Sequence, residues 1–290
     1  MLELKLKSII KESWSNVWRH KLLWLFGVFA GAGGFFYDFS NNDCLKGPKP
    51  DWSVVLWNIK HALARWETLL VLAIVILLFV VSILVSLLCS AALIRGISQI
   101  KNSETPEFKG LVKFGWQKVW RLLLIGVLLN IVNAGLIVGL IIYYLQIGTI
   151  KLDAPAIVIL SLLVAYNLFI FLFRYYIYCF AVLEEQKAWL AIKSGWKIFS
   201  ENIGALLLVK IVEIGLRLAT IAVVILALLI CALPFVLLAI LLGVAFGEAA
   251  IAVIGVFAVI VFFALVLVMQ GLFNAFFYHY LSLVYWAVKQ

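Results

Sequence analysis

Five long stretches of this chain contain no Asp, Glu, Lys or Arg, and they constrain its fold more than any other feature. They comprise residues 68–94, 122–150, 154–173, 218–247 and 249–288. Each is near or above the roughly 20 residues that an α-helix needs to cross about 30 Å of hydrocarbon. Leu, Ile, Val, Ala and Phe dominate them without strict alternation, which favours transmembrane helices over the strands of a membrane barrel.

A shorter apolar run, Leu22–Tyr37, comes before these five. The segment preceding it is too long and too mixed in charge for the start of a signal peptide, so we interpret the run as a first transmembrane helix. The composition agrees, because 66% of the 290 residues are hydrophobic and 13% are charged, against about 45–50% and 25% in soluble domains. We therefore expect an all-α, polytopic membrane helix bundle with six transmembrane helices and one membrane domain, 1–290.

The basic residues predict how this bundle is oriented. Most Lys and Arg residues fall in the N-terminal segment, between the second and third spans, and between the fourth and fifth spans; fewer fall in the opposite connections, at Lys46, Lys49, Lys60, Arg65 and Lys151. Cytoplasmic segments carry the excess of Lys and Arg, so both termini are expected in the cytoplasm. The net charge of +9 then suits an anionic membrane surface, and no nucleic acid partner is expected.

A short aromatic module occurs three times. Its copies are Trp14-Ser-Asn-Val-Trp18-Arg19, Trp116-Gln-Lys-Val-Trp120-Arg121 and Trp196-Lys-Ile-Phe199. Each copy ends a basic amphipathic stretch and precedes an apolar run. The pattern predicts three repeat units, about 1–95, 96–183 and 184–290, each made of a cytoplasmic amphipathic helix followed by a transmembrane hairpin.

The amphipathic stretches place Trp on an apolar stripe and Lys away from it. The predicted stripes are Phe108, Leu111, Val112, Trp116 and Val119 in the second copy and Trp189, Ile192, Trp196, Phe199 and Ile203 in the third. This arrangement is typical of a helix that lies in the membrane interface. The predicted interfacial anchors are Trp14, Trp18, Trp116, Trp120, Trp189 and Trp196. A further amphipathic helix is predicted on the opposite side, over residues 52–66.

Three segments resemble a broad group of six-span bacterial inner-membrane proteins of uncharacterised function. They are KESWSNVWRHKLLWLFGV, AALIRGISQIKNSETPEFKGLVKFGWQKVWRLLL and VLEEQKAWLAIKSGWKIFSENIGALLLV. The group includes the membrane domain attached to some glycerophosphoryl diester phosphodiesterases. The resemblance implies a multi-pass protein of the bacterial cytoplasmic (inner) membrane. It carries over no catalytic residue, because the catalytic barrel of those enzymes needs about 250 further residues.

The sharpest local feature is Lys210, Glu213 and Arg217, which the spacing places on one helix face. In one interpretation they lie inside the membrane, where charges are costly and often mark a substrate or ion path. In the other, the preceding cytoplasmic helix continues at the interface as far as Arg217 and the span begins at Leu218. Avoiding the cost of a charge at mid-depth favours the second interpretation.

Amides form a second candidate set inside the spans: Asn130, Asn133, Asn167, Gln270 and Asn274. Together with Lys210, Glu213 and Arg217 they make up a candidate polar intramembrane face. They could line a polar path through the bundle. They could also be hydrogen-bonding contacts between helices, typically worth about 0.6 kcal/mol each, and we favour this structural role.

The sequence contains no nucleotide-binding, metalloprotease or serine-hydrolase motif, so we expect no cofactor, metal or catalytic residue. The leading hypothesis is a non-enzymatic envelope protein that interacts with membrane lipids, or with another membrane protein or a second copy of itself. The alternative is a transporter or channel that uses the polar residues inside the bundle. A membrane enzyme acting on lipid phosphodiesters is a third hypothesis, based on the resemblance alone.

Overall fold

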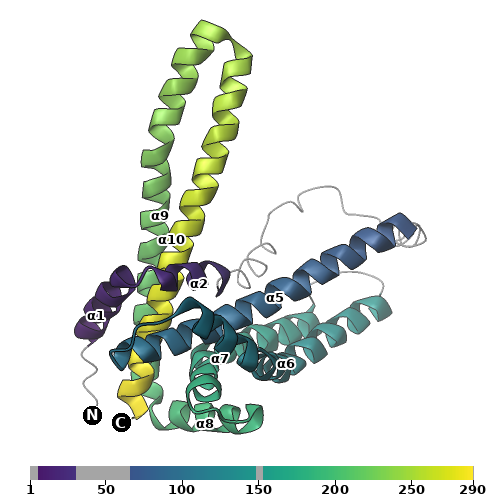
Figure 1. Ribbon diagram of the computed structural model, residues 1–290. Coiled ribbons are helices and arrows are strands. Elements are labelled where there is room, and N and C mark those ends of the chain that lie inside the picture. Colours follow the sequence, from purple (N-terminus) through teal and green to yellow (C-terminus); the bar gives the residue numbers. More distant parts are fainter. Residues whose placement is uncertain (1–5, 31–65, 148–152, 290) are drawn as a thin grey trace.

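The computed structural model describes residues 6–30, 66–147 and 153–289, and the regular elements in these ranges are α-helices (Figure 1). They are α1 (Leu6–Arg19), α2 (Leu22–Ala30), α5 (Trp66–Lys101), α6 (Phe108–Ile147), α7 (Ala154–Leu183), α8 (Ala188–Glu201), α9 (Ile203–Phe246) and α10 (Glu248–Lys289). Part of the first predicted span, residues 31–37, and most of the amphipathic helix predicted over 52–66 lie outside the described residues.

Among the described residues, five helices are long and apolar enough to cross a membrane. They cover Trp66–Lys101, Phe108–Tyr144, Ala154–Leu183, Ile203–Leu242 and Ile251–Lys289. The prediction of an all-α polytopic membrane protein is confirmed. The first of the six predicted spans begins with α2, which the structure describes as far as Ala30.

The core lies where α5, α7 and α10 meet. Each of the three helices has a densely buried stretch, around Leu93 in α5, Ile177 in α7 and Val284 in α10. Hydroxyl groups link the three helices, because Tyr278 Oη lies 2.8 Å from Ser90 Oγ and Tyr175 Oη lies 2.6 Å from Ser282 Oγ. These three helices form the centre of the packed body.

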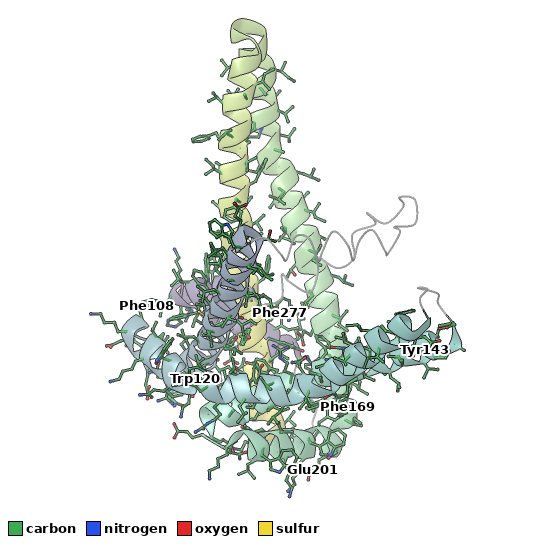
Figure 2. All side chains as sticks on the ribbon, turned by 90° about the vertical axis from the view of Figure 1, so that its right-hand side faces the viewer. Phe108, Trp120, Tyr143, Phe169, Glu201 and Phe277 are labelled. Atoms are coloured by element: carbon green, nitrogen blue, oxygen red, sulfur yellow. The ribbon has the colours of Figure 1, made fainter. Side chains whose placement is uncertain are left out.

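Long apolar arms project from this body. α9 and α10 turn at Gly247, whose φ of +76° suits glycine, and their hairpin stands away from the other helices (Figures 1 and 2). Side chains along the hairpin are exposed, as at Leu218, Leu241 and Phe263. α5 projects in a different direction with its own exposed apolar end, near Trp66. Apolar surface of this extent fits a lipid environment.

Each amphipathic helix packs on α5, α7 or α10 through a small residue that comes directly before a Trp. Ser13 of α1 is buried against His279 of α10, with Oγ 3.3 Å from Nδ1. A Cβ on Gly115 of α6 would lie 2.7 Å from the Leu88 carbonyl oxygen of α5. A Cβ on Gly195 of α8 would lie 2.6 Å from Ile177 Cγ1 of α7. Each contact therefore requires a small side chain.

The predicted apolar stripes coincide only in part with the faces that are buried, which include Leu111, Val119 and Phe199. Trp116 and Trp189 are exposed by 59% and 73%, and Phe108 and Ile203 are also exposed. The buried faces also run through small residues such as Gly115 in α6 and Ala191 and Gly195 in α8. Small residues allow two helix backbones to approach closely, which large rings would prevent.

The second amphipathic stretch is not a separate helix. α6 runs without a break from Phe108 to Ile147. The other two junctions do contain a break, at His20–Lys21 before α2 and at Asn202 before α9. Accordingly, the third amphipathic helix, α8, ends at Glu201 and does not itself continue to Arg217.

Candidate functional site

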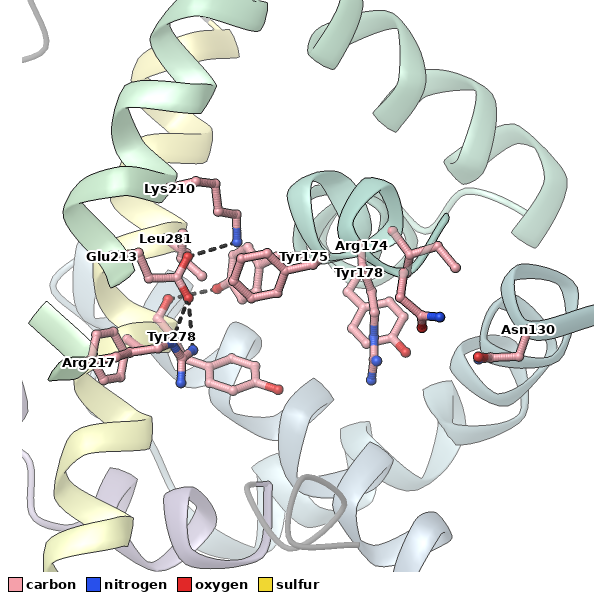
Figure 3. Close-up of a pocket in the computed structure, with 13 residues that line it drawn as sticks. Asn130, Arg174, Tyr175, Tyr178, Lys210, Glu213, Arg217, Tyr278 and Leu281 are labelled. Carbon is pink, nitrogen blue, oxygen red and sulfur yellow. Dashed lines mark hydrogen bonds and ion pairs between the residues drawn. The ribbon is translucent and has the colours of Figure 1, made fainter. Parts of the chain in front are cut away.

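A cavity of about 310 Å³ opens between α6, α7, α9 and α10. Its described lining combines charged, aromatic and amide side chains: Asn130, Asn167, Ile170, Phe171, Arg174, Tyr175, Tyr178, Lys210, Glu213, Arg217, Phe277, Tyr278 and Leu281. In Figure 3, Arg174 and Tyr178 of α7 lie between the Lys210–Glu213–Arg217 group and Asn130. The cavity therefore brings together residues from four helices that are far apart in the sequence.

Glu213 is the centre of a buried ion-pair network on α9. Its Oε2 accepts a hydrogen bond from Lys210 Nζ at 2.7 Å. Its Oε1 accepts two bonds from Arg217, from Nε at 3.0 Å and from Nη2 at 2.8 Å. The side chains of Lys210 and Glu213 are 4% and 1% exposed, whereas that of Arg217 is 44% exposed. Both carboxylate oxygens are thus engaged, and Arg217 extends from the network into more open space.

Aromatic rings hold the cationic groups of the cavity. Lys210 Nζ lies 4.4 Å from the centre of the Phe171 ring. The guanidinium carbon of Arg217 lies 4.3 Å from the centre of the Phe277 ring, and that of Arg174 lies 5.4 Å from the Tyr178 ring. Stacking of this kind stabilises a cation and restricts its orientation. The two guanidinium groups are consequently placed by rings from α10 and α7.

The cavity has an excess of positive charge. Its described lining holds three cationic side chains, Arg174, Lys210 and Arg217, and one carboxylate, Glu213. Formal charges therefore add to two positive among these residues. A site with such a charge in a largely apolar surrounding attracts anions strongly, because the low dielectric weakens screening.

Three of the candidate amides form one cluster beside the cavity. Asn167 Nδ2 donates to Asn133 Oδ1 at 3.1 Å, and Asn133 Nδ2 donates to Asn167 Oδ1 at 3.2 Å. Asn133 also donates to Asn130 Oδ1 at 3.3 Å, and Asn130 donates to the Gly126 carbonyl at 2.8 Å. The reciprocal Asn133–Asn167 bonds join α6 to α7, and two of the three amides, Asn130 and Asn167, line the cavity.

The other two candidate amides lie elsewhere. Asn274 donates to the Gly27 carbonyl oxygen at 3.0 Å and thereby joins α10 to α2. The helices cross closely there, since a Cβ on Gly27 would lie 2.1 Å from the Gly271 carbonyl oxygen. Gln270 lines a second cavity of about 300 Å³ between α9 and α10, together with Thr220 and Phe273. The candidate polar residues are thus distributed over three places.

The six predicted interfacial anchors are all at the surface. Trp14, Trp18, Trp116, Trp120, Trp189 and Trp196 are exposed by between 42% and 73%. They belong to α1, α6 and α8, which surround the packed body. Exposed Trp on helices beside apolar arms has the distribution of side chains that anchor a protein at the headgroup level.

Sequence reasoning did not single out Arg174 or the rings around it. Arg174 bears only on the predicted orientation, and no role is predicted for Tyr175 or Tyr178, which follow the charge-free run 154–173. One signal was present, because Arg174 and Arg217 each border a charge-free run, at 154–173 and from Leu218 onward. That both belong to one cavity depends on how α7 and α9 pack.

Within the described ranges, no group of three His, Cys, Asp or Glu side chains is placed to hold a metal ion. The side chains that face the cavity suit electrostatic and stacking contacts with a bound anion.

Comparison of the chain with protein-family models, with curated proteins and with solved structures finds no match in any of the three. The cavity's own geometry therefore carries the functional argument.

Proposed function

We propose that this is a non-enzymatic membrane protein that binds an anionic lipid in the cavity between α6, α7, α9 and α10. The observation that carries the proposal is the pair Arg174 and Arg217, which line one cavity with a formal charge of two positive. An anionic headgroup would contact these guanidinium groups, and its acyl chains would lie along the exposed apolar side chains beyond them. Arginine is well suited to this role, because its planar donors match phosphate oxygens.

The position of the two arginines along their helices supports a headgroup site. Arg174 follows the charge-free residues 154–173, and Arg217 precedes the apolar, exposed part of α9 that begins at Leu218. We place both at the membrane interface and the apolar arms in the hydrocarbon. The part of α9 beyond Arg217, residues 218–246, is about 44 Å long at 1.5 Å per residue, so it can cross a bilayer of about 30 Å. This placement keeps the start of the span at Leu218 from the second interpretation, but Lys210, Glu213 and Arg217 belong to α9 and not to the preceding amphipathic helix.

The exposed Trp residues are consistent with the same placement. We propose that α1, α8 and the start of α6 lie along the cytoplasmic interface, as their Lys and Trp content predicts. The protein would then be a multi-pass protein of the bacterial inner membrane with both termini in the cytoplasm. The three contacts of Ser13, Gly115 and Gly195 also suggest three repeat units, in which each amphipathic helix packs on the last helix of the preceding unit in cyclic order.

Lipid retention tests the proposal. The chain and the variants Arg174→Gln and Lys113→Gln would be purified in a mild detergent, and bound lipid per protein would be counted by native mass spectrometry. Lys113 is an exposed residue of α6, so its variant removes one positive charge without touching the cavity. We expect Arg174→Gln to lose anionic lipid while Lys113→Gln retains it. Equal retention by both variants would contradict the proposal.

The second candidate is a transporter or channel, and the amide cluster favours it. Asn130 and Asn167 extend the polar lining of the cavity from Glu213 on α9 toward α6. Flux of inorganic anions through proteoliposomes, compared between the chain and Glu213→Gln, would test it. Labelling of Lys210→Cys and Arg217→Cys by an impermeant maleimide adds a second measure. Ready labelling of both from the cytoplasmic side would indicate an interfacial site and remove the argument for charges within the membrane.

A further inference from the structure

We propose that the anionic lipid is a phosphate monoester, held between the guanidinium groups of Arg174 and Arg217. This inference rests on the proposed function and specifies its ligand. The charge of the cavity is the first argument. Three cationic side chains face one carboxylate among the described lining residues, and a monoester carries about −1.5 to −2 at neutral pH. A diester carries a single negative charge and would neutralise only part of the excess.

The second argument comes from the neutral polar side chains of the cavity, whose hydrogen bonds are made within the protein. Tyr175 Oη donates to the Tyr278 carbonyl oxygen at 2.7 Å and also contacts Ser282. Tyr278 Oη is engaged by Ser90, and the Asn167 amide donates to Asn133 and to the Leu163 carbonyl oxygen. These three neutral polar side chains therefore serve the packing of the helices. Recognition by neutral hydrogen bonds, as a sugar or a glycerol headgroup would require, is accordingly disfavoured.

The arrangement of Arg217 is the third argument. Two of its five N–H donors are directed at Glu213 Oε1, and its guanidinium carbon lies 4.3 Å from the centre of the Phe277 ring. Glu213 and Lys210 thus act as positioning residues, because they fix the guanidinium group while 44% of the Arg217 side chain remains exposed. The remaining donors can form parallel hydrogen bonds to phosphate oxygens. A monoester offers three unsubstituted oxygens as acceptors for arginine donors.

The test measures binding of four probes to the full chain in nanodiscs of phosphatidylcholine. The probes are phosphatidic acid, a monoester; phosphatidylglycerol, a diester; additional phosphatidylcholine as the neutral reference; and inorganic phosphate as a soluble competitor. We expect phosphatidic acid to bind about tenfold more tightly than phosphatidylglycerol, the equivalent of about one charge-assisted hydrogen bond. Inorganic phosphate at equal concentration should not displace it, since it lacks acyl chains.

Two variants make the result specific to the cavity. Arg217→Lys keeps the charge but removes the planar donors, and Arg174→Gln leaves the Glu213 network intact. Because each loses arginine hydrogen bonds to the phosphate oxygens, both variants should reduce the preference for the monoester to about twofold or less. Lys113→Gln should retain the full preference. Folding of each variant would be verified by its thermal unfolding in detergent, and the preference is read as a ratio within each variant.

Each outcome separates this inference from the proposed function. If phosphatidic acid and phosphatidylglycerol bind equally, and both more tightly than phosphatidylcholine, the inferred preference for a monoester is wrong. The proposed anionic-lipid site is then still supported. If neither binds more tightly than phosphatidylcholine, both proposals are wrong. If inorganic phosphate displaces phosphatidic acid at equal concentration, the ligand is a soluble phosphate and the lipid is excluded. An unchanged preference in Arg217→Lys and Arg174→Gln would place the monoester outside this cavity.

Discussion

Arg217 donates two hydrogen bonds to a single oxygen of Glu213, at 3.0 and 2.8 Å, while the other oxygen of Glu213 accepts from Lys210. The carboxylate is almost completely buried and the Arg217 side chain is half-exposed. A carboxylate in this position neutralises Lys210 and at the same time orients Arg217 toward the cavity. The network therefore couples the packing of α9 to the electrostatics of the proposed lipid site.

Glu213→Gln should destabilise the protein strongly. Removing the carboxylate leaves Lys210 buried without its charge partner, and breaking a buried pair in this way costs about 3–5 kcal/mol. Glu201→Gln is the matched control, because Glu201 pairs with Lys197 at 3.9 Å on the surface of α8, where such pairs contribute about 0–1 kcal/mol. Thermal unfolding in detergent should show a large decrease in Tm for the first variant and almost none for the second. Similar Tm values would mean that the buried pair does not stabilise the fold.

Gly115→Ala should loosen the contact of α6 with α5. The added Cβ would lie 2.7 Å from the Leu88 carbonyl oxygen, which is backbone and cannot move without shifting the helix. Gly126→Ala provides the control in the same helix, because no atom lies within 4 Å of its added Cβ. Alanine favours a helix over glycine by about 1 kcal/mol, so we expect Gly126→Ala to unfold at the same or a higher temperature and Gly115→Ala at a lower one. A raised Tm in Gly115→Ala would contradict the close approach.

The reciprocal amide pair of Asn133 and Asn167 should show energetic coupling. Each variant to Leu leaves one amide without its partner between α6 and α7, whereas the double variant removes both. At about 0.6 kcal/mol per interhelical bond, the coupling should be about 1 kcal/mol, with the double variant less destabilised than the sum of the single ones. Unfolding free energies in mixed micelles of detergent and dodecyl sulfate would provide the measurement. Strict additivity would show that the pair contributes nothing as a pair.

The contact of α6 with the loop after α7 should depend on pH. Lys118 Nζ donates to Glu185 Oε1 at 2.7 Å, and this hydrogen bond lowers the pKa of Glu185 below its ordinary value of 4.5. A lowered pKa in the folded state means that the contribution is complete above the unfolded value and is lost as pH falls through the folded value. Lys118→Met should therefore have a lower Tm than the chain at pH 7, and the difference should shrink below about pH 4.5. A difference that stays constant over this range would exclude Glu185 as its source.

The sequence predicts the fold class because charge-free runs that are long enough to span a membrane fit few structures other than transmembrane helices. The boundary at Glu248 is an example, because the charge-free runs 218–247 and 249–288 meet there. In the structure, α9 ends at Phe246 and α10 begins at Glu248. The faces of the amphipathic helices could not be predicted in the same way. Hydrophobic periodicity identifies Trp116 and Trp189 as apolar, but it does not distinguish a side chain that faces lipid from one that packs on another helix.

The candidate site was predictable only where its residues lie on one helix. Spacing along one helix places Lys210, Glu213 and Arg217 on one face, because positions three and four apart are neighbours. Arg174 of α7 lines the same cavity because of tertiary packing, which residue spacing in the sequence cannot predict. The charge of the cavity, and hence the class of ligand, depends on this fourth residue.

Photo-crosslinking with an anionic lipid that carries its reactive group at the headgroup tests the central claim most directly. The chain would be irradiated in nanodiscs, and the modified peptides would be identified by mass spectrometry, with a phosphatidylcholine probe as the control. We predict adducts concentrated around Phe171–Tyr178 and Phe277–Leu281, greatly reduced with the phosphatidylcholine probe and in Arg174→Gln. Adducts spread along the apolar arms, or equal labelling by the two probes, would contradict the assignment of this cavity to an anionic lipid.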